Sequence, residues 1–140
     1  MANVKFNRFG KAIASNDMDS VTIKAMLMAT SYTPDADAHV FVSDISASRA
    51  SGTTDLTLSN VTITVDNTDN RVEFDSDNLV TGTITATTNA YVLYISTGVD
   101  STSELLCYIE LTDGVTTPKT YSVVAGVLTV VVNANGHFAI

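Results

Sequence analysis

The chain has 140 residues, a single cysteine and a net charge of −8, and only 16% of its residues are charged. This length fits one domain whose core needs no metal or disulfide, and one cysteine excludes an internal disulfide. The acidic balance argues against binding to nucleic acid or to an anionic membrane surface, because both require a basic footprint.

Membrane insertion and export also leave no signature in the sequence. No stretch approaches the roughly 18 apolar residues of a membrane span, and no apolar leader opens the chain. We therefore expect a protein that is made in the cytoplasm and has no membrane partner. The 17 valines and 21 threonines favour β-strands, because branching at Cβ suits a pleated sheet better than a helix.

The first 16 residues carry a charge of +3 and no acid, whereas the remainder carries −11. The stretch also holds two phenylalanines, and aromatic and basic residues are enriched at interface centres. We interpret residues 1–16 as a possible basic N-terminal arm that contacts a partner. Solvated terminal charge is an equal alternative, and the stretch is also compatible with an edge strand of the domain's own sheet. The candidate contact residues are Lys5, Phe6, Arg8, Phe9 and Lys11.

Residues 21–28 alternate with Val21, Ile23, Ala25 and Leu27 on one side. This pattern predicts a strand, although Lys, Ala, Met and Leu also favour a helix. In a strand, the opposite side presents three further candidate contact residues, Lys24, Met26 and Met28. Methionine is frequent at interaction surfaces, but the chain itself could equally cover this second face.

Residues 33–41 carry the signals of a helix start. Thr33 can cap, Pro34 suits the first helical position, and Asp35 and Asp37 oppose the positive end of the helix dipole. The sequence therefore predicts a short helix near residues 34–44, the one helix we expect.

The rest of the chain reads as strands separated by turns. Residues 61–65 and 71–75 alternate around the turn formers of residues 66–70, which predicts a hairpin. Residues 83–87 alternate as well. Near-continuous apolar runs, typical of strands covered on both faces, follow at residues 91–95, 105–109 and 127–132. Asn135 and Gly136 mark a turn before a short terminal strand at residues 137–140.

These elements predict a mainly β fold: an antiparallel β-sandwich or jelly-roll-like barrel of about eight to ten short strands with one short helix. We expect residues 1–140 to form a single domain.

Groups for catalysis, metals or cofactors are sparse, so we expect no enzyme, no metal and no cofactor. His39 and His137 are more often packing or surface residues than bases, and Cys107 lies inside an apolar run, where a thiol is usually buried. Calcium is the strongest metal candidate, at Asp66, Asp69, Asp75 and Asp77. However, their spacing matches no calcium loop, and Asp is common in turns simply because it bonds its own backbone.

The most distinctive motif of the chain is Ser31-Tyr-Thr-Pro-Asp-Ala-Asp-Ala-His-Val-Phe41, followed by the acid Asp44. In this motif above all, the sequence resembles the head decoration or cement proteins of tailed bacteriophages, which are small structural proteins of the virion. Nearly the whole chain takes part in the resemblance. The other matching segments are residues 5–11, 22–28, 61–72, 91–95, 108–109 and 135–140.

The resemblance implies a virion protein on the capsid surface, made in the host cytoplasm, that binds the major capsid protein and cements its lattice. It also implies self-association, as a homodimer or else a trimer. It brings no catalytic residue. Alternatives are a tail, neck or fibre-associated structural protein, or a glycan-binding adhesion module.

Overall fold

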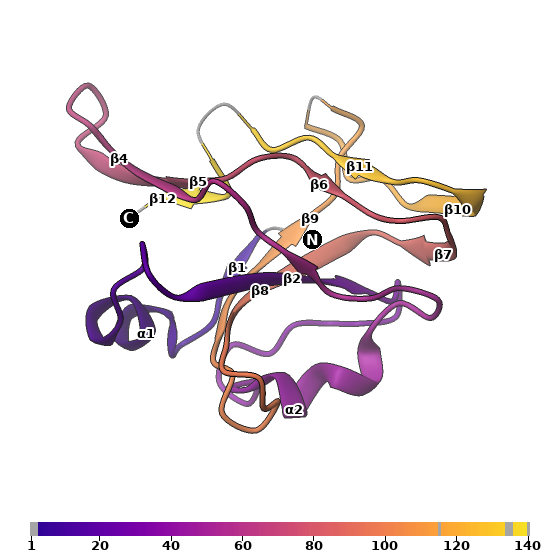
Figure 1. The fold of residues 1–140 in the computed structure, drawn as a ribbon, viewed down its shortest axis with the longest axis horizontal. Helices are drawn as coiled ribbons and strands as arrows, with labels where there is room; N and C mark the ends of the chain where they lie inside the picture. Colours follow the sequence, from indigo (N-terminus) through magenta and orange to yellow (C-terminus); the bar gives the residue numbers. More distant parts are fainter. Residues whose placement is uncertain (1–2, 115, 134–135, 140) are drawn as a thin grey trace.

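The computed structural model describes residues 3–114, 116–133 and 136–139. Its strands form antiparallel sheets in a sandwich-like arrangement (Figure 1). The helical elements are α1 (Phe9–Ser15), α2 (Val42–Ile45) and the 3-10 turn η1 (Ser46–Ser48). The strands are β1 (Val4–Lys5), β2 (Thr22–Met28), β3 (Leu56–Thr57), β4 (Thr62–Asp66), β5 (Arg71–Asp75), β6 (Leu79–Val80), β7 (Ile84–Thr88), β8 (Ala90–Ser96), β9 (Leu105–Glu110), β10 (Tyr121–Gly126), β11 (Thr129–Val130) and β12 (Phe138–Ala139).

The central sheet has five strands in the order β1-β9-β8-β2-β3. Alternation along β2 and β8 sends Ile23, Leu27 and Leu93 into one apolar cluster and Met28 and Val92 into another. The apolar runs of β8 and β9 are thus covered on both faces, as their composition predicts.

Three smaller sheets cover one face of the central sheet: β12-β5-β4, β11-β6 and β10-β7. Phe74 of β5, Leu79 of β6 and Val130 of β11 belong to the same buried cluster as Ile23 and Leu93. This cluster is the core of the sandwich. The described strands close into no barrel, so the sandwich is confirmed and the barrel alternative is wrong.

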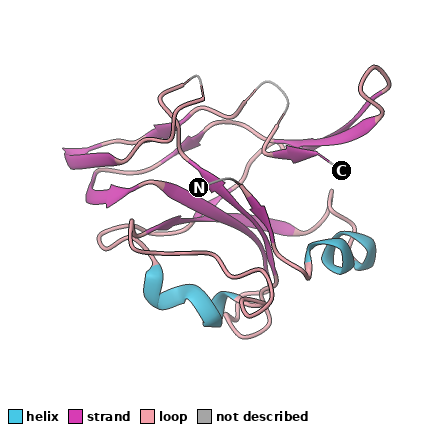
Figure 2. Ribbon diagram, turned by 180° about the vertical axis from the view of Figure 1, so that it is seen from behind, coloured by secondary structure: helices cyan, strands magenta, loops and turns pink. Residues whose placement is uncertain are grey.

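The other face of the central sheet is covered by Val4 and Phe6 and by residues of the segment 29–55, which includes α2 (Figure 2). The prediction of a strand at β2 is confirmed, but the prediction that Met26 and Met28 lie on an outer face is wrong. Both are fully buried beneath Phe6, Val42 and Ile45. The alternative that the chain covers this face itself is the one the structure bears out.

The N-terminal segment is folded onto the domain and is no extended arm. Val4 of β1 pairs with Tyr108 of β9, so β1 is an edge strand of the central sheet. Helix α1 follows and turns Phe9 and Ala12 inward, at the spacing of one helical face. Phe6 and Phe9 are 1% and 7% exposed, so the prediction that they contact a partner is wrong for the folded chain.

The predicted helix at residues 34–44 is wrong for most of its length, because α2 begins only at Val42. Asp35 does accept hydrogen bonds from the N–H groups of Asp37 and Ala38, both at 3.0 Å, but this forms a local turn. Phe41 then bridges to Glu104 in extended conformation, and Leu105 N–H donates to the carbonyl of Val40 at 3.0 Å. Pairing with the start of β9 therefore prevails over the local helix signals.

The predicted hairpin is confirmed: β4 and β5 pair from Thr62 and Asp75 to Asp66 and Arg71. At the C-terminus, β12 pairs with β5 where the terminal strand is expected, while Asn135 and Ile140 lie outside the described residues. Within the described part of the chain, no helix is long and apolar enough to cross a membrane.

Candidate functional site: an uncharged valine face

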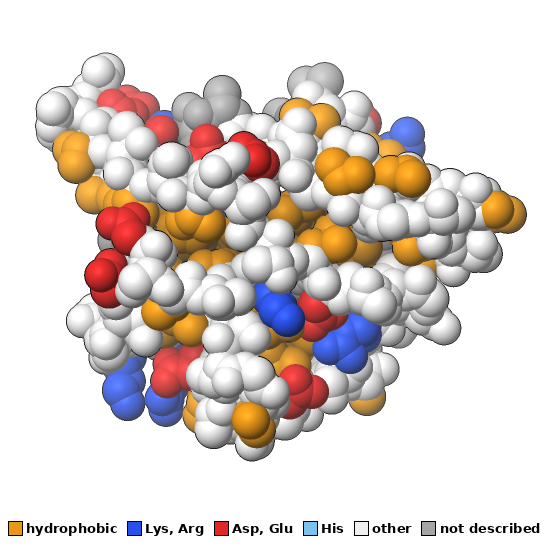
Figure 3. Space-filling view, viewed as in Figure 1, with side chains coloured by type: hydrophobic (Ala, Val, Ile, Leu, Met, Phe, Trp, Pro, Cys, Tyr) orange, Lys and Arg blue, Asp and Glu red, His pale blue; other side chains and the backbone are white. Residues whose placement is uncertain are grey.

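Part of the covering layer of the sandwich carries no formal charge. Residues 78–99 and 120–140 contain no Asp, Glu, Lys or Arg, although the whole chain has a net charge of −8. These segments hold β6, β7, β10 and β11 of the covering layer. Figure 3 shows hydrophobic side chains at the end of the molecule where β10 and β11 lie. An uncharged surface of this kind is inexpensive to remove from water.

The β6–β11 ribbon is apolar on both sides, but the chain covers only one of them. Leu128 and Val130 are each 8% exposed and face the core, together with Leu79 of β6. Val127 and Val131, on the opposite side of the strand, are 56% and 74% exposed. Residues 127–132 were predicted to be covered on both faces, and this prediction is wrong for the outer face.

Pairing between the two strands aligns the exposed residues. Thr129 lies opposite Val80, which is 54% exposed, and Val130 lies opposite Leu79. Hydrogen bonds extend the ribbon beyond these pairs: Thr81 N–H donates to the carbonyl of Leu128 at 3.0 Å, and Val132 N–H donates to Oδ1 of Asn78 at 3.0 Å. We call the outer residues of this ribbon the valine face: Val80, Val127, Thr129 and Val131.

A further exposed valine, Val124, lies close to this face along the chain. The pairing of β10 with β7 shifts between Val123 and Gly126, and Ala125 adopts a positive φ of 47°. The shift is a bulge, which turns Val124 out to 80% exposure. Contiguous exposed apolar surface typically marks an interaction site. Burying a largely exposed valine contributes about 1–2 kcal/mol, so the face can support firm protein contact.

The cations predicted as contact residues do not converge. Lys5 and Lys11 are exposed. Arg8 is half-buried: its Nη2 lies 3.0 Å from Glu104 Oε1, and its guanidinium sits 5.5 Å from the centre of the Phe41 ring. Lys24 lies on β2, which β8 and β9 separate from β1. Lys24 therefore does not belong to the same surface patch as the cations of the N-terminal segment.

Lys24 lies instead beside a hollow of about 290 Å³ on the central sheet. Its neighbours there include Arg49, Asp55 and Tyr94. Asp55 accepts two hydrogen bonds from Arg49, at 2.7 and 2.9 Å, and one from the Tyr94 hydroxyl at 2.6 Å. These bonds hold the segment of residues 49–55 against the sheet, so Asp55, one of the two acids that line the hollow, is already partnered.

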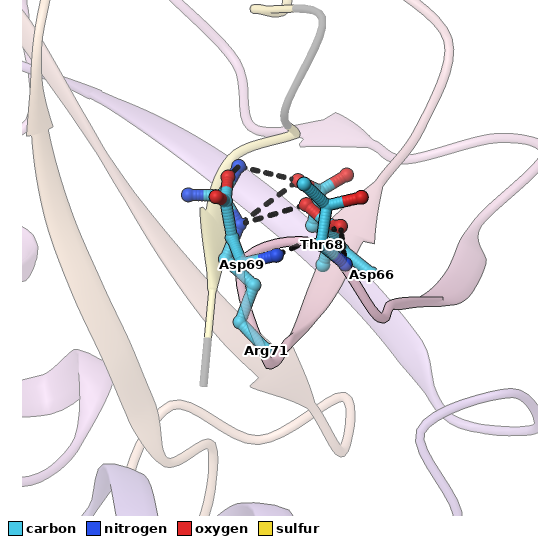
Figure 4. Close-up of polar contacts among 5 residues, drawn as sticks. Asp66, Thr68, Asp69 and Arg71 are labelled. Carbon is cyan, nitrogen blue, oxygen red and sulfur yellow. Dashed lines mark hydrogen bonds and ion pairs between the residues drawn. The ribbon is translucent and has the colours of Figure 1, made fainter.

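The acidic hairpin tip is organised as a turn (Figure 4). Asp66 Oδ1 accepts the N–H groups of Thr68 and Asp69, at 2.9 and 3.2 Å, and these bonds lower the pKa of Asp66. Arg71 lies 3.5 Å from Asp66 Oδ2 and 3.4 Å from Asp69 Oδ2, and binds Glu73 at 2.7 Å. Among the described residues no three metal-ligating side chains converge.

Both histidines are tied into hydrogen-bond networks. His39 Nδ1 accepts the N–H of Asp35 at 3.1 Å and lies 3.0 Å from the Tyr32 hydroxyl. His137 lies 2.8 Å from both the Tyr91 hydroxyl, at Nδ1, and Ser76 Oγ, at Nε2. Ser76 Oγ also lies 2.9 Å from the carbonyl oxygen of Asp77, so its hydroxyl has a second acceptor within reach.

Cys107 is buried in β9, and burial raises the pKa of its thiol. A buried protonated thiol is a poor nucleophile.

The valine face was missed as a site although two signals for it exist in the sequence. Residues 127–132 form an apolar run long enough to need covering on both faces, and the segments around this run lack charge altogether. Together these signals indicate an apolar strand with one face that the described chain leaves exposed.

Comparison with known protein families, with curated proteins and with solved structures finds no match to this chain.

Proposed function

We propose that this chain is a virion structural protein of a tailed phage that binds the outside of the capsid and cements the lattice of the major capsid protein. The observation that carries the proposal is the valine face: an apolar, uncharged strand face that the chain leaves uncovered. The family resemblance, which involves nearly the whole sequence, supplies the identity of the partner.

The mechanism is mass action on an assembled surface. A protein that binds the assembled shell and not dispersed subunits stabilises the shell by its binding free energy at every site. Val127 and Val131 supply apolar contact area on a strand held rigidly by the core residues Leu128 and Val130. A rigid, preorganised face loses little conformational entropy on docking, which favours affinity.

The test is co-sedimentation of the purified protein with phage heads that lack it. Val127→Lys places a charge in the valine face and is expected to weaken binding about tenfold, because burying an unpaired ammonium is costly. Val99→Lys is the matched control, since Val99 and Val127 are both 56% exposed but Val99 lies in the loop between β8 and β9.

Loss of head binding in the Val127 variant alone supports the proposal. Equal binding by both variants would contradict the role of the valine face. Failure of the unsubstituted protein to bind heads, together with binding to isolated tails or to glycans, would replace the cement role with one of the alternative roles.

A further inference from the structure

Strand β4 is the unpaired edge of its sheet. In the order β12-β5-β4, no other strand of the described residues hydrogen-bonds to the outer side of β4. None of its residues is buried, and Ile63 and Val65 are 41% and 65% exposed. The hairpin also projects from the body of the molecule, so its outer edge is accessible (Figures 1 and 2). A row of free N–H and C=O groups is therefore presented to solvent.

Several of the usual protections of an edge strand are missing here. Residues 59–65 contain no charged residue and no proline, and the one charge of the strand, Asp66, lies at its end. The pairing of β4 with β5 runs without a register shift, so no bulge twists the edge away. Natural edges are normally blunted by such devices because an open edge recruits another strand. Their absence at β4 indicates an edge that pairs with a strand of another chain when the protein functions.

The edge is complementary to itself. In an antiparallel pair of two β4 strands centred on Thr64, Ile63 lies opposite the second copy's Val65, and Thr62 opposite its Asp66. Apolar residues thus meet apolar residues, and threonine meets threonine on the axis. Asp66, the one charged residue of β4, meets a hydroxyl and is already held by Arg71.

We infer that β4 pairs with β4 of a second copy about a twofold axis through Thr64, which joins two three-stranded sheets into one sheet of six strands. A second copy is the occupant because the edge is complementary to itself, and because residues 59–65 carry no charge, so that two chains of charge −8 meet there without opposing like charges. Such a contact is isologous, and twofold dimers are the commonest oligomers.

Apolar surface beside the strand adds to the contact. A hollow of about 310 Å³ opens next to Ile63; its apolar lining comes from Ile13 and Met18 on the α1 side and from Val72 and Phe74 of β5, and Asn16 and Asp17 lie at its polar side. The second copy's Ile63 and Val65 project on the same side of the extended sheet as this hollow. The inference does not depend on the capsid role, because the valine face belongs to a different sheet.

Cysteine cross-linking of the full chain tests the register. Thr64→Cys places two thiols directly opposite on the axis, about 4.5–5.5 Å apart between Cα atoms, within disulfide range. Thr62→Cys is the matched control, because the two copies of residue 62 lie four residues apart along the pair, about 13 Å. Both threonines are exposed and Cys107 is buried, so background oxidation is low.

We expect the Thr64 variant to form a covalent dimer under mild oxidation and the Thr62 variant to remain a monomer on a non-reducing gel. Equal cross-linking of both variants would overturn the register, and an unsubstituted chain that sediments as a monomer at all accessible concentrations would overturn the dimer.

A charge exchange tests the pairing of side chains by sedimentation equilibrium. Val65→Lys alone and Ile63→Glu alone are each expected to raise the dimer Kd about tenfold. Each substitution occurs twice in a twofold dimer and each time places a charge opposite an apolar side chain. The double variant places the introduced carboxylate opposite the introduced ammonium in both halves and is expected to restore the Kd to within about threefold. A double variant that is as weak as the sum of both single variants would contradict this interface. Head binding, measured separately, distinguishes failure of the dimer from failure of the capsid role.

Discussion

His137 Nδ1 lies 2.8 Å from the hydroxyl oxygen of Tyr91, which links the C-terminal segment to the central sheet. The backbone N–H of His137 also donates to the carbonyl of Phe74 at 2.8 Å, and its Nε2 lies 2.8 Å from Ser76 Oγ. The ring is therefore held between Tyr91 of β8 and Ser76, which follows β5, and the backbone of His137 is held by β5 itself. Both ring nitrogens are used, so the imidazole serves as a structural tie between the two layers.

This tie predicts a loss of stability in mild acid. Burial lowers the pKa of His137 from 6.5 to about 4, with Asp75 opposing the effect. A lowered folded-state pKa means that this stability is present above pH 6.5 and is lost as the pH falls towards 4. The difference corresponds to about 3 kcal/mol at most. Urea unfolding between pH 7 and pH 4 measures it.

His137→Gln is the matching variant, since glutamine keeps hydrogen-bonding capacity but does not titrate. It should be less stable at pH 7 yet lose less stability between pH 7 and pH 4. The carboxylates Asp35 and Asp44, whose pKa values are lowered from 3.8 by backbone hydrogen bonds, contribute to the loss only below about pH 5, and they do so equally in the variant and the parent chain. An identical pH dependence in the variant and the parent chain would contradict the role of His137.

Met26 belongs to the apolar cluster between the central sheet and α2, which is part of the core and not a contact surface. Truncating the Met26 side chain is therefore expected to lower stability strongly. Met26→Ala is expected to lower the free energy of unfolding by about 2–4 kcal/mol, because Met26 is fully buried between the sheet and the α2 side. Val99→Ala, on an exposed loop, should change it by less than about 0.5 kcal/mol. Chemical denaturation measures both, and similar small effects would show that Met26 is accessible after all.

Asp55 joins Arg49 to Tyr94 through three hydrogen bonds. Asp55→Asn removes the charge and is expected to destabilise the fold by about 1–3 kcal/mol, because the guanidinium of Arg49 loses its bidentate partner. Asp69→Asn is the control: its ion pair with Arg71 is 3.4 Å long, its side chain is 58% exposed, and such pairs contribute little. Thermal unfolding of the two variants compares them, and an equal loss would contradict the argument.

The exposed lysine of α1 offers a test of the basic N-terminal segment. Deleting residues 1–11 removes β1 and Phe6 and so damages the fold, which makes a deletion uninformative. Lys11→Glu is expected to weaken binding to phage heads several-fold at low salt, with a smaller effect at about 0.5 M salt because surface charges are screened. Lys119→Glu changes net charge equally at another exposed position. Equal effects would assign the change to net charge alone.

Much of the fold could be predicted because local pattern and final environment agree. The hairpin of β4 and β5 follows from alternation around a cluster of turn formers. The central strands β8 and β9 follow from apolar runs that need covering on both faces. In these segments neither a competing propensity nor a distant partner changes the outcome.

The wrong predictions arise where contacts between residues far apart in the sequence determine the local structure. Residues 34–41 carry helix-start signals, but Phe41 bridges to Glu104, sixty-three positions away, and the backbone stays extended. Helix α1 is only seven residues long and too short to show a clear period. Met26 could not be assigned to core or surface, because nothing local indicates that residues 29–55 fold over that face. The valine face was missed for the opposite reason. The apolar run of residues 127–132 predicts burial on both faces, but no described part of the chain packs against its outer face.

Cryo-electron microscopy of the intact phage particle tests the capsid role most directly. The proposal predicts density for this chain at regular positions outside the major capsid lattice, with Val127 and Val131 facing the shell and β4 directed towards a second copy. A bare head surface, with the density in the tail or neck, would contradict the cement role.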